Sequence, residues 1–257
     1  MILAVIQARM TSTRLSGKVM LPIIGKPVIW RIYERLKFSK KIDKICISTS
    51  TNSEDDVIVD FAEANKISYH RGSESNLISR HLGAAKAFGA ETIVRITADD
   101  PVVDPEIVDQ LITLYENNND ADFVSNTKVH SFPIGLDVEI IPIKTLEKFL
   151  KKSDNPTFYE YFISAYIYEH PNEFKSVGLQ LDKPSLLRWT LDYPEDYEFI
   201  KKIYSNLYQS GKIFHMSDIH ELLKQKPEFN EINAMHYSEF SHLKYEREKK
   251  SKEQSSK

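Results

Sequence analysis

The chain has 257 residues, of which 41% are hydrophobic, and its formal net charge at pH 7 is −3. This length suits one α/β domain, or one domain with a small appendage. The near-neutral charge argues against a general nucleic-acid binder, which is usually strongly basic. The single cysteine, Cys46, lies in an apolar run, so a disulfide scaffold is excluded and Cys46 is expected in the core.

No apolar run approaches the roughly 20 residues that a membrane-spanning helix needs. The apolar stretch at the N-terminus is too short for a signal peptide, and no basic segment precedes it. We therefore expect a soluble, cytoplasmic protein that binds neither a membrane nor nucleic acid.

Strand-like and helix-like segments alternate through the first half of the chain. Short apolar runs predict strands at residues 1–6, 44–48, 67–70, 92–97 and 122–126. Apolar residues at helical spacing predict helices that begin at Pro27 and that span residues 54–65, 77–88 and 105–117. This alternation predicts an α/β fold with a mostly parallel sheet covered by helices.

The second half of the chain is less regular. Its apolar pattern predicts strands at residues 135–141, 174–179 and 187–191, and helices at residues 144–152, 157–169 and 194–208. We expect one domain over residues 1–243. Residues 244–257 are charged and serine-bearing without apolar periodicity, which is typical of a disordered tail.

Three cations gather in residues 9–18, a stretch of ten residues shortly after the first predicted strand. Arg9, Arg14 and Lys18 occur there together with hydroxyl-bearing residues and a glycine: Thr11, Ser12, Thr13 and Gly17. Arginine forks and lysine ammonium groups bind phosphate oxygens, and glycine lets the backbone approach a ligand closely. A surface loop can carry three cations without function, but ligands of open α/β sheets bind beyond the carboxyl ends of the strands. The segment matches neither the Walker A nor the GxGxxG pattern, and it predicts a polyanion site suited to a triphosphate.

Two aspartates follow the predicted strand at residues 92–97. Hard divalent cations prefer carboxylate oxygens, and Asp99 and Asp100 come at the same sheet edge as the cation-bearing loop. Pro101 ends the strand pairing. A turn with acidic residues ahead of the next helix is the alternative for this pair, and Asp104 is better explained as the N-cap of the helix at Pro105.

A further aspartate, Asp192, follows the predicted strand at residues 187–191. It could complete a two-aspartate metal site with Asp99. An N-cap role for the helix at residues 194–208 explains it equally well.

These motifs, taken in order, resemble the cytidylyltransferases of the spore-coat polysaccharide biosynthesis (SpsF) type, which are related to CMP-Kdo and CMP-sialic acid synthetases. The resemblance starts with the pattern Gln-Ala-Arg-Met-x-Ser-x-Arg-Leu-x-Gly-Lys and covers roughly residues 1–210. It continues through residues 25–27, 49–56, 70–73, 94–101, 135–139 and 188–196.

The resemblance implies a three-layer α/β/α, Rossmann-like fold of the glycosyltransferase-A-like nucleotidyltransferase kind, and a homodimer. CTP and Mg²⁺ are the implied ligands. The resemblance implies that four loop residues hold the triphosphate: Arg9, Ser12, Arg14 and Lys18. The three cations among them are also implied to stabilise the leaving pyrophosphate. The implied metal ligands are Asp99 and Asp192. The residues implied to approach the base and ribose are Ala8, Arg9, Arg71, Ser73 and Arg80.

The sequence departs from the family pattern at three places. Ser16 stands where a proline is usual, and Ala98 replaces the usual glycine before Asp99. The stretch at residues 160–167 is aromatic where the family has polar residues of the acceptor side. We therefore leave the small-molecule acceptor open, with Asp137, Glu139 and Tyr161 as candidate acceptor-side residues.

Two other classes of protein remain open at this point. A glycosyltransferase would share the fold but use an Asp-x-Asp pair, which the adjacent Asp99 and Asp100 do not form. A non-catalytic nucleotide-binding subunit is the other alternative, and the presence of Lys18 and both aspartates argues against it.

Overall fold

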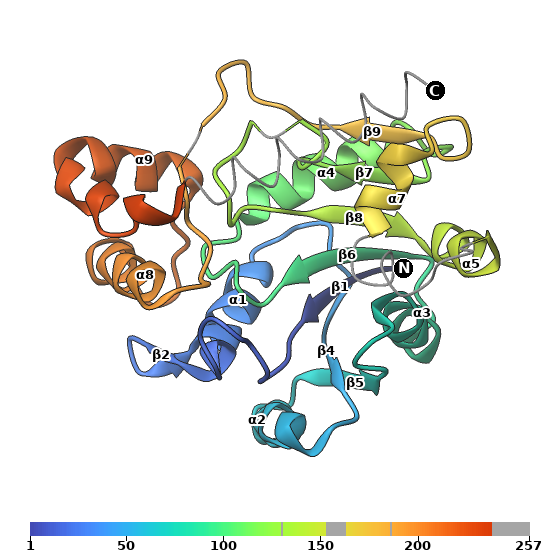
Figure 1. The fold of residues 1–257 in the computed structure, drawn as a ribbon, viewed down its shortest axis with the longest axis horizontal. Helices are drawn as coiled ribbons and strands as arrows, with labels where there is room; N and C mark the ends of the chain where they lie inside the picture. The colour runs from blue at the N-terminus through green and yellow to red at the C-terminus, as the bar shows by residue number, and fades with distance from the viewer. Residues whose placement is uncertain (130, 153–162, 186, 238–257) are drawn as a thin grey trace.

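A mixed seven-stranded sheet forms the centre of the computed structural model, which describes residues 1–129, 131–152, 163–185 and 187–237 (Figure 1). The strand order is β5-β4-β1-β6-β8-β7-β9. Pairing is parallel from β5 to β6 and between β7 and β9, and β8 runs antiparallel to both of its neighbours. The bounds are β1 Ile2–Gln7, β4 Lys44–Ser50, β5 Ser68–Gly72, β6 Thr92–Thr97, β7 Phe123–Ser125, β8 Glu139–Pro142 and β9 Ser176–Gly178.

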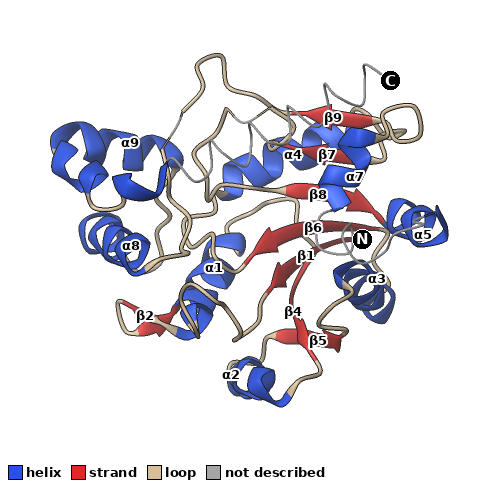
Figure 2. Cartoon of the chain, viewed as in Figure 1, coloured by secondary structure: helices blue, strands red, loops and turns tan. Residues whose placement is uncertain are grey.

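Helices cover both faces of the sheet, which confirms the predicted three-layer α/β/α fold (Figures 1 and 2). One face shares a core with α1 Val28–Leu36, α2 Asp56–Ala64, α4 Pro105–Glu116, α8 Pro194–Leu207 and α9 Met216–Gln225. The other face shares a core with α3 Leu77–Phe88, α5 Ile143–Lys152 and α7 Ile163–Glu169. Short 3₁₀ helices are η1 Lys18–Met20, η2 Ser53–Asp55, η3 Pro227–Glu231 and η4 Ala234–His236.

Strand β1 is apolar from Ile2 to Ile6 because both of its faces are buried. Ala4 and Ile6 point into the core under α1, whereas Leu3 and Val5 point into the core under α3. A continuous apolar run is typical of a parallel strand between two helical layers. Since side chains alternate along a strand, Gln7 lies on the α3 face and ends the strand at the carboxyl edge of the parallel strands.

The most regular predictions are confirmed, and element ends shift by a few residues. The helix at residues 77–88 and the strand at residues 92–97 have the predicted bounds. Helix α1 begins at Val28, with Pro27 as its N-cap residue. A small hairpin, β2 Pro22–Ile23 and β3 Lys26–Pro27, was not predicted. Cys46 is buried in the core, as expected.

The predicted strand at residues 187–191 is wrong. The structure has only an isolated bridge there, between Ile134 and Arg188. The reason is that the N–H groups of residues 189 and 191 do not bond one neighbouring strand. Trp189 N donates to Ile134 O at 2.6 Å, whereas Leu191 N donates to Asp99 O at 2.7 Å. A segment that is bonded in this way crosses the sheet edge instead of extending the sheet.

The strand predicted at residues 135–141 begins only at Glu139. Gly135 has a φ of +103°, which favours glycine, and a Cβ there would meet Trp189 and Thr190 backbone atoms at 2.4–2.7 Å. Asn126 then bonds Leu136 O and Val138 N through its side chain, so this part of the backbone is satisfied without a strand partner.

Two predictions fall partly or wholly outside the described residues. The helix predicted at residues 157–169 is seen as α7 from Ile163, and residues 153–162 are not described. The tail predicted at residues 244–257 also lies outside the described part. Within the described residues, none of the helices has the length and apolar character to cross a membrane.

Candidate functional site

The cation-bearing residues 9–18, which we call the cation loop, leave β1 at the carboxyl edge of the sheet. The loop closes on itself, because Gly17 N donates to Met10 O at 3.0 Å. Gly17 is left-handed, with φ +67°, and caps the 3₁₀ turn that begins at Lys18. The turn brings Lys18 back towards the sheet, where its side chain is only 11% exposed.

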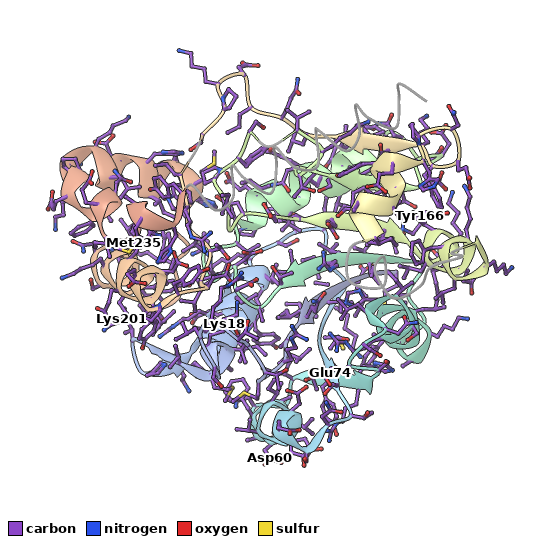
Figure 3. All side chains as sticks on the ribbon, viewed as in Figure 1. Lys18, Asp60, Glu74, Tyr166, Lys201 and Met235 are labelled. Carbon is purple, nitrogen blue, oxygen red and sulfur yellow. The ribbon has the colours of Figure 1, made fainter. Side chains whose placement is uncertain are left out.

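The ammonium group of Lys18 lies between the two predicted metal ligands. Its Nζ atom is 2.8 Å from Asp99 Oδ2 and 2.9 Å from Asp192 Oδ1. Burial disfavours the ammonium, but the charges of Asp99 and Asp192 outweigh it and raise the pKa of Lys18. Lys18 therefore stays charged, and the carboxylates from β6 and from the segment before α8 converge on one cationic centre. Figure 3 shows Lys18 beside α1, near the middle of the molecule.

Asp192 is brought to Asp99 by the segment that sequence reasoning took for a strand. Both Thr190 Oγ1 and Leu191 N donate to Asp99 O, which fixes this segment on the end of β6. The N-cap alternative for Asp192 is wrong, because Tyr193 is the N-cap of α8 and Asp196 accepts from the backbone N–H of Asp192 and Tyr193.

Two arginines also contact Asp192. Arg14 of the cation loop lies 2.7 Å from its Oδ1, and buried Arg188 lies 3.2 Å from its Oδ2. Burial opposes ionisation of Asp192, but Lys18 and Arg14 outweigh it and lower the pKa to about 2. Arg188 was not predicted as a site residue. No sequence pattern pointed to this contact, because residues 187–191 read as a strand, and residues four apart in an extended chain do not meet.

Asp100 and Asp104 have different places from Asp99. Asp100 is buried and accepts from Thr97 Oγ1 at 2.7 Å, and burial together with the charges of Asp99 and Asp137 raises its pKa well above the usual range. Asp100 is therefore a buried acid next to Asp99, and its side chain is not exposed at the site. Asp104 is the N-cap of α4, as predicted, and accepts from Glu106 N.

Asp104 also forms a possible ligand cluster with Glu106 and His215, whose ligand atoms lie within 4.8 Å of one another. Both Asp104 oxygens are already used, because His215 Nδ1 lies 2.9 Å from Oδ1 and Met216 N donates to Oδ2 at 2.7 Å. These bonds join the start of α4 to the start of α9, so we assign this cluster a structural role.

The remaining predicted residues of the cation loop differ in how far they are held by the protein. Arg9 is exposed, and no ion pair or hydrogen bond joins its side chain to any of the residues that the structure describes. Ser12 Oγ accepts weakly from Leu15 N at 3.5 Å, inside the loop. Ala8 N donates to Ser48 O at 3.0 Å, so the backbone amide of Ala8 is already bonded within the protein.

Arg71, Ser73 and Arg80 lie beside the cation loop and brace the turns around it. Arg71 donates to Ser50 O and Asn52 O and pairs with Asp56 at 2.6 Å. Ser73 Oγ accepts from Asn76 N, and buried Arg80 donates to Ser73 O at 3.2 Å. Each of the three thus has a bond within the protein, and their approach to the base and ribose stays a prediction.

The two described acceptor-side candidates lie on the α3 face of the sheet. Glu139 Oε2 is 2.6 Å from Arg95 Nη1, and Arg95 Nε donates to Gln7 at 2.8 Å, so one polar row crosses β1, β6 and β8. Asp137 lies two residues before Glu139. Burial, followed by the charges of Glu139 and Asp99, raises the pKa of Asp137 to about 7. Tyr161 lies outside the described residues.

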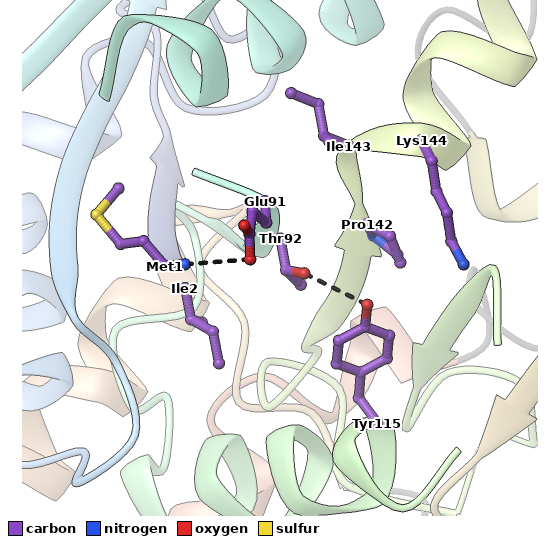
Figure 4. A pocket seen from close by; sticks show the side chains of 8 residues that line it. All are labelled: Met1, Ile2, Glu91, Thr92, Tyr115, Pro142, Ile143 and Lys144. Atoms are coloured by element: carbon purple, nitrogen blue, oxygen red, sulfur yellow. Dashed lines mark hydrogen bonds and ion pairs between the residues drawn. The ribbon is translucent and has the colours of Figure 1, made fainter. Parts of the chain in front are cut away.

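A surface pocket of about 450 Å³ lies at the opposite edge of the sheet, far from these groups (Figure 4). Its lining residues are Met1, Ile2, Glu91, Thr92, Tyr115, Pro142, Ile143 and Lys144. Glu91 lies 3.6 Å from the N-terminal amine, and Thr92 donates to Tyr115. The pocket lacks the converging charges of the carboxyl edge, so we place the functional site at that edge.

The sequence matches the family model for cytidylyltransferases over residues 3–234. The chain belongs to the cytidylyltransferase family. This confirms the predicted class of enzyme, a CTP-dependent nucleotidyltransferase, ahead of the glycosyltransferase alternative.

Similar proteins cover nearly the whole of this cytidylyltransferase. It is 32% identical over 238 residues to an uncharacterized protein of Methanocaldococcus jannaschii, covering 91% of this chain and 94% of that one. It is 28% identical to the spore coat polysaccharide biosynthesis protein SpsF of Bacillus subtilis, over 88% of this chain and 95% of that one. The structure of a cytidylyltransferase from Leptospira borgpetersenii aligns with a TM-score of 0.84 and 34% identity, over 89% of this chain and 95% of that one.

A shorter match joins part of the chain to an enzyme that is named for a sugar acid. The chain is 30% identical over 127 residues to the 3-deoxy-manno-octulosonate cytidylyltransferase of Chlamydia trachomatis, which is 48% of each chain.

Proposed function

We propose that this cytidylyltransferase transfers CMP from CTP to a sugar acid, a sugar or polyol phosphate, or a similar small acceptor, for surface polysaccharide or glycoconjugate biosynthesis. An acceptor oxygen forms a bond to the α-phosphorus of CTP, the bond between the α-phosphorus and its bridging oxygen breaks, and pyrophosphate leaves. The observation that carries this proposal is the cluster in which Lys18 lies between Asp99 and Asp192 at the end of an arginine-bearing loop.

The charges of the cation loop suit the triphosphate. Lys18 and Arg14 form ion pairs with carboxylates of the site. Exposed Arg9 has no ion pair or hydrogen bond to a described residue. In phosphoryl and nucleotidyl transfer, such groups act by holding the phosphates in line and by stabilising the charge that builds on the leaving group. We assign these three residues to that task.

Asp99 and Asp192 are the residues that would hold Mg²⁺. Their fit is supported by Lys18, whose ammonium group stands in for a cation 2.8–2.9 Å from one oxygen of each carboxylate. A bound divalent cation supplies charge neutralisation for the phosphate oxygens. The protein's own part is to hold Asp99 through the end of β6 and Asp192 through Arg188.

The acceptor side is supported by the relatives and by the polar row on the α3 face. SpsF is named for spore coat polysaccharide, and the partial match is named for a sugar acid. Asp137 is the acceptor-side group that we propose to contact the attacking hydroxyl, because its raised pKa suits proton uptake near neutral pH. Glu139 is already paired with Arg95, and we assign it a positioning role.

The proposal is tested with CTP, Mg²⁺ and a panel of acceptors, with pyrophosphate release as the measurement. The panel contains sugar acids, sugar phosphates and polyol phosphates. The wild type should release pyrophosphate with at least one class of acceptor, and Asp99→Ala should lose at least about a thousandfold in kcat/KM. Asp120→Ala, at an exposed residue paired with Lys175, is the matched control and should keep full activity.

Turnover by Asp99→Ala at the wild-type rate would contradict the metal assignment. Nucleotide binding without pyrophosphate release across the whole panel would instead favour a non-catalytic subunit. The predicted homodimer stays a prediction, which light scattering of the purified protein measures.

A further inference from the structure

Asp55 is a buried carboxylate that joins the cation loop to the neighbouring strand. It is 2% exposed and lies in η2, the turn after β4. Its Oδ1 accepts from Met10 N at 2.6 Å, and its Oδ2 accepts from the backbone N–H of Ser50 at 3.1 Å and from Ser50 Oγ at 2.5 Å. Both oxygens are used, one for its own turn and one for a residue 45 positions earlier in the chain.

The bond from Met10 reaches the point at which the cation loop closes. Met10 N is held by Asp55, and Met10 O accepts from Gly17 N at 3.0 Å. Gly17 directly precedes Lys18, whose ammonium group lies between Asp99 and Asp192. One residue thus has its donor fixed by Asp55 and its acceptor fixed by the last residue before Lys18.

A second carboxylate strengthens the same side of the loop. Glu74, which Figure 3 shows near β5, accepts from Thr11 Oγ1 at 3.3 Å and from Asn52 Nδ2 at 2.5 Å. Thr11 follows Met10 in the loop, and Asn52 lies in the turn that carries Asp55. Met10 and Thr11, which we call the loop base, are therefore bonded to side-chain carboxylates from two turns. Of these two carboxylates, Asp55 is the buried one.

A charged acceptor suits this place. Hydrogen bonds from a backbone N–H to a carboxylate are about twice as strong as those to a neutral acceptor. Burial opposes ionisation of Asp55, but the bonds from Ser50 and Met10 outweigh it and lower its pKa. An ionised carboxylate therefore holds the loop base throughout the neutral pH range.

We infer that Asp55 is a positioning residue for nucleotide binding, which acts through Met10 and Gly17 to set where Lys18 and Arg14 meet the triphosphate. Asp55 does not touch the nucleotide in this account. The inference rests on the proposed function for the identity of the nucleotide, and on the hydrogen bonds of the loop base for the positioning itself.

The first test measures amide hydrogen exchange without any nucleotide. In Asp55→Asn, Met10 N faces either an amide NH₂, which cannot accept, or a neutral amide oxygen in place of a carboxylate oxygen, so its bond is lost or weakened in both orientations. We expect exchange at Met10 and Gly17 to be about tenfold faster than in the wild type. Unchanged exchange at both amides would overturn the inference, whatever the enzyme does with CTP.

A matched control lies at the other end of β1. Asp43 Oδ2 accepts from Ile2 N at 2.7 Å, so Asp43→Asn weakens the same type of backbone-to-carboxylate bond at the start of β1, away from the site. Asp43→Asn should leave exchange at Met10 and Gly17 as in the wild type. Ser50→Ala is a second control, because it removes one bond to Asp55 and leaves the bond from Met10 in place.

The second test measures CTP binding with Mg²⁺ by calorimetry. The dissociation constant should rise about tenfold in Asp55→Asn, because small displacements of charged groups are costly for positioning. It should stay at the wild-type value in both controls. In a Lys18→Met background the Asp55→Asn change should weaken binding much less, since residues that act through one another are not additive.

Asp55→Glu keeps the charge, and we expect it to restore part of the lost affinity. If Asp55→Asn does not fold, amide exchange and CTP binding are measured on Asp55→Glu instead. Full additivity with Lys18→Met, or wild-type affinity in both Asp55 variants, would overturn the inference and leave the proposed function standing. Failure of the wild type to bind CTP would overturn the proposed function instead, and amide exchange would still decide the role of Asp55.

Discussion

The two sides of the carboxyl edge of the sheet carry opposite arrangements of charge. On the side of the cation loop, Arg9 and Arg14 lie at the surface and Lys18 is buried, and both Arg14 and Lys18 contact Asp192. On the side of β8, Asp137 and Glu139 are carboxylates close to the sheet, and Arg95 pairs with Glu139. The first arrangement suits a polyanion, and the second suits a neutral group that gives up a proton.

The difference separates two kinds of variant. Changes on the loop side should act on CTP and on the leaving pyrophosphate, whereas changes on the β8 side should act on the acceptor. The following predictions test this division, from the largest expected effect to the smallest.

Among the three variants tested for activity, Lys18→Met should have the largest effect on turnover. It removes the ammonium group that touches both Asp99 and Asp192, and we expect kcat/KM for CTP to fall by a factor equivalent to about 3 kcal/mol of transition-state stabilisation. Steady-state pyrophosphate release at varied CTP measures this. Lys26→Met is the control, because Lys26 is an exposed lysine of the β2–β3 hairpin that lies over the ring of Trp30. Equal activity of the two variants would remove Lys18 from the site.

Asp137→Asn should act on the acceptor and leave CTP binding unchanged. An amide cannot take up a proton, and we expect kcat to fall about a hundredfold if Asp137 receives the proton of an acceptor hydroxyl. The measurement is kcat against pH: the wild type should gain activity as pH rises through about 7, and the variant should lose this dependence. A tenfold weaker CTP affinity in Asp137→Asn would break the division between the two sides.

The same residue predicts a dependence of stability on pH. The pKa of Asp137 is about 7 in the folded protein and 3.8 in the reference state, so between these values the folded state holds a proton that the unfolded state releases. The free energy of unfolding should therefore fall as pH rises from about 4 to 7, by up to about 4 kcal/mol relative to Asp137→Asn. Urea unfolding of both proteins at pH 5 and pH 8 should detect about 3 kcal/mol of this fall, because pH 5 already lies above the reference pKa. A parallel dependence in the two proteins would show that Asp137 ionises normally.

Arg9→Ala should have the smallest effect. Arg9 is exposed and the described residues offer it no partner, so the stability of the free protein should change by less than about 0.5 kcal/mol. We expect the KM for CTP to rise severalfold, and less so at high salt, because an exposed cation is screened. A fall in melting temperature of the unliganded variant would contradict this reading of Arg9.

Much of the fold follows from patterns that are local in the sequence. The apolar runs of β1 and β6 predicted buried strands because both faces of a central parallel strand are covered. The N-cap role of Asp104 was also readable, since an aspartate directly before a proline is typical of a helix start. By contrast, residues 187–191 have a strand-like pattern but fold as a crossing segment, because their donors bond Ile134 and Asp99.

By itself, the sequence determined which residues could do the chemistry: a loop of cations after the first strand, and single aspartates after two later segments. Residue type and spacing along the chain are enough for that, because strand ends of a parallel sheet share an edge. Only the tertiary structure decided how these groups are held. The bonds of Lys18 to Asp99 and Asp192, and of Asp55 to Met10, span 81, 174 and 45 positions, and no local pattern records contacts between such distant residues.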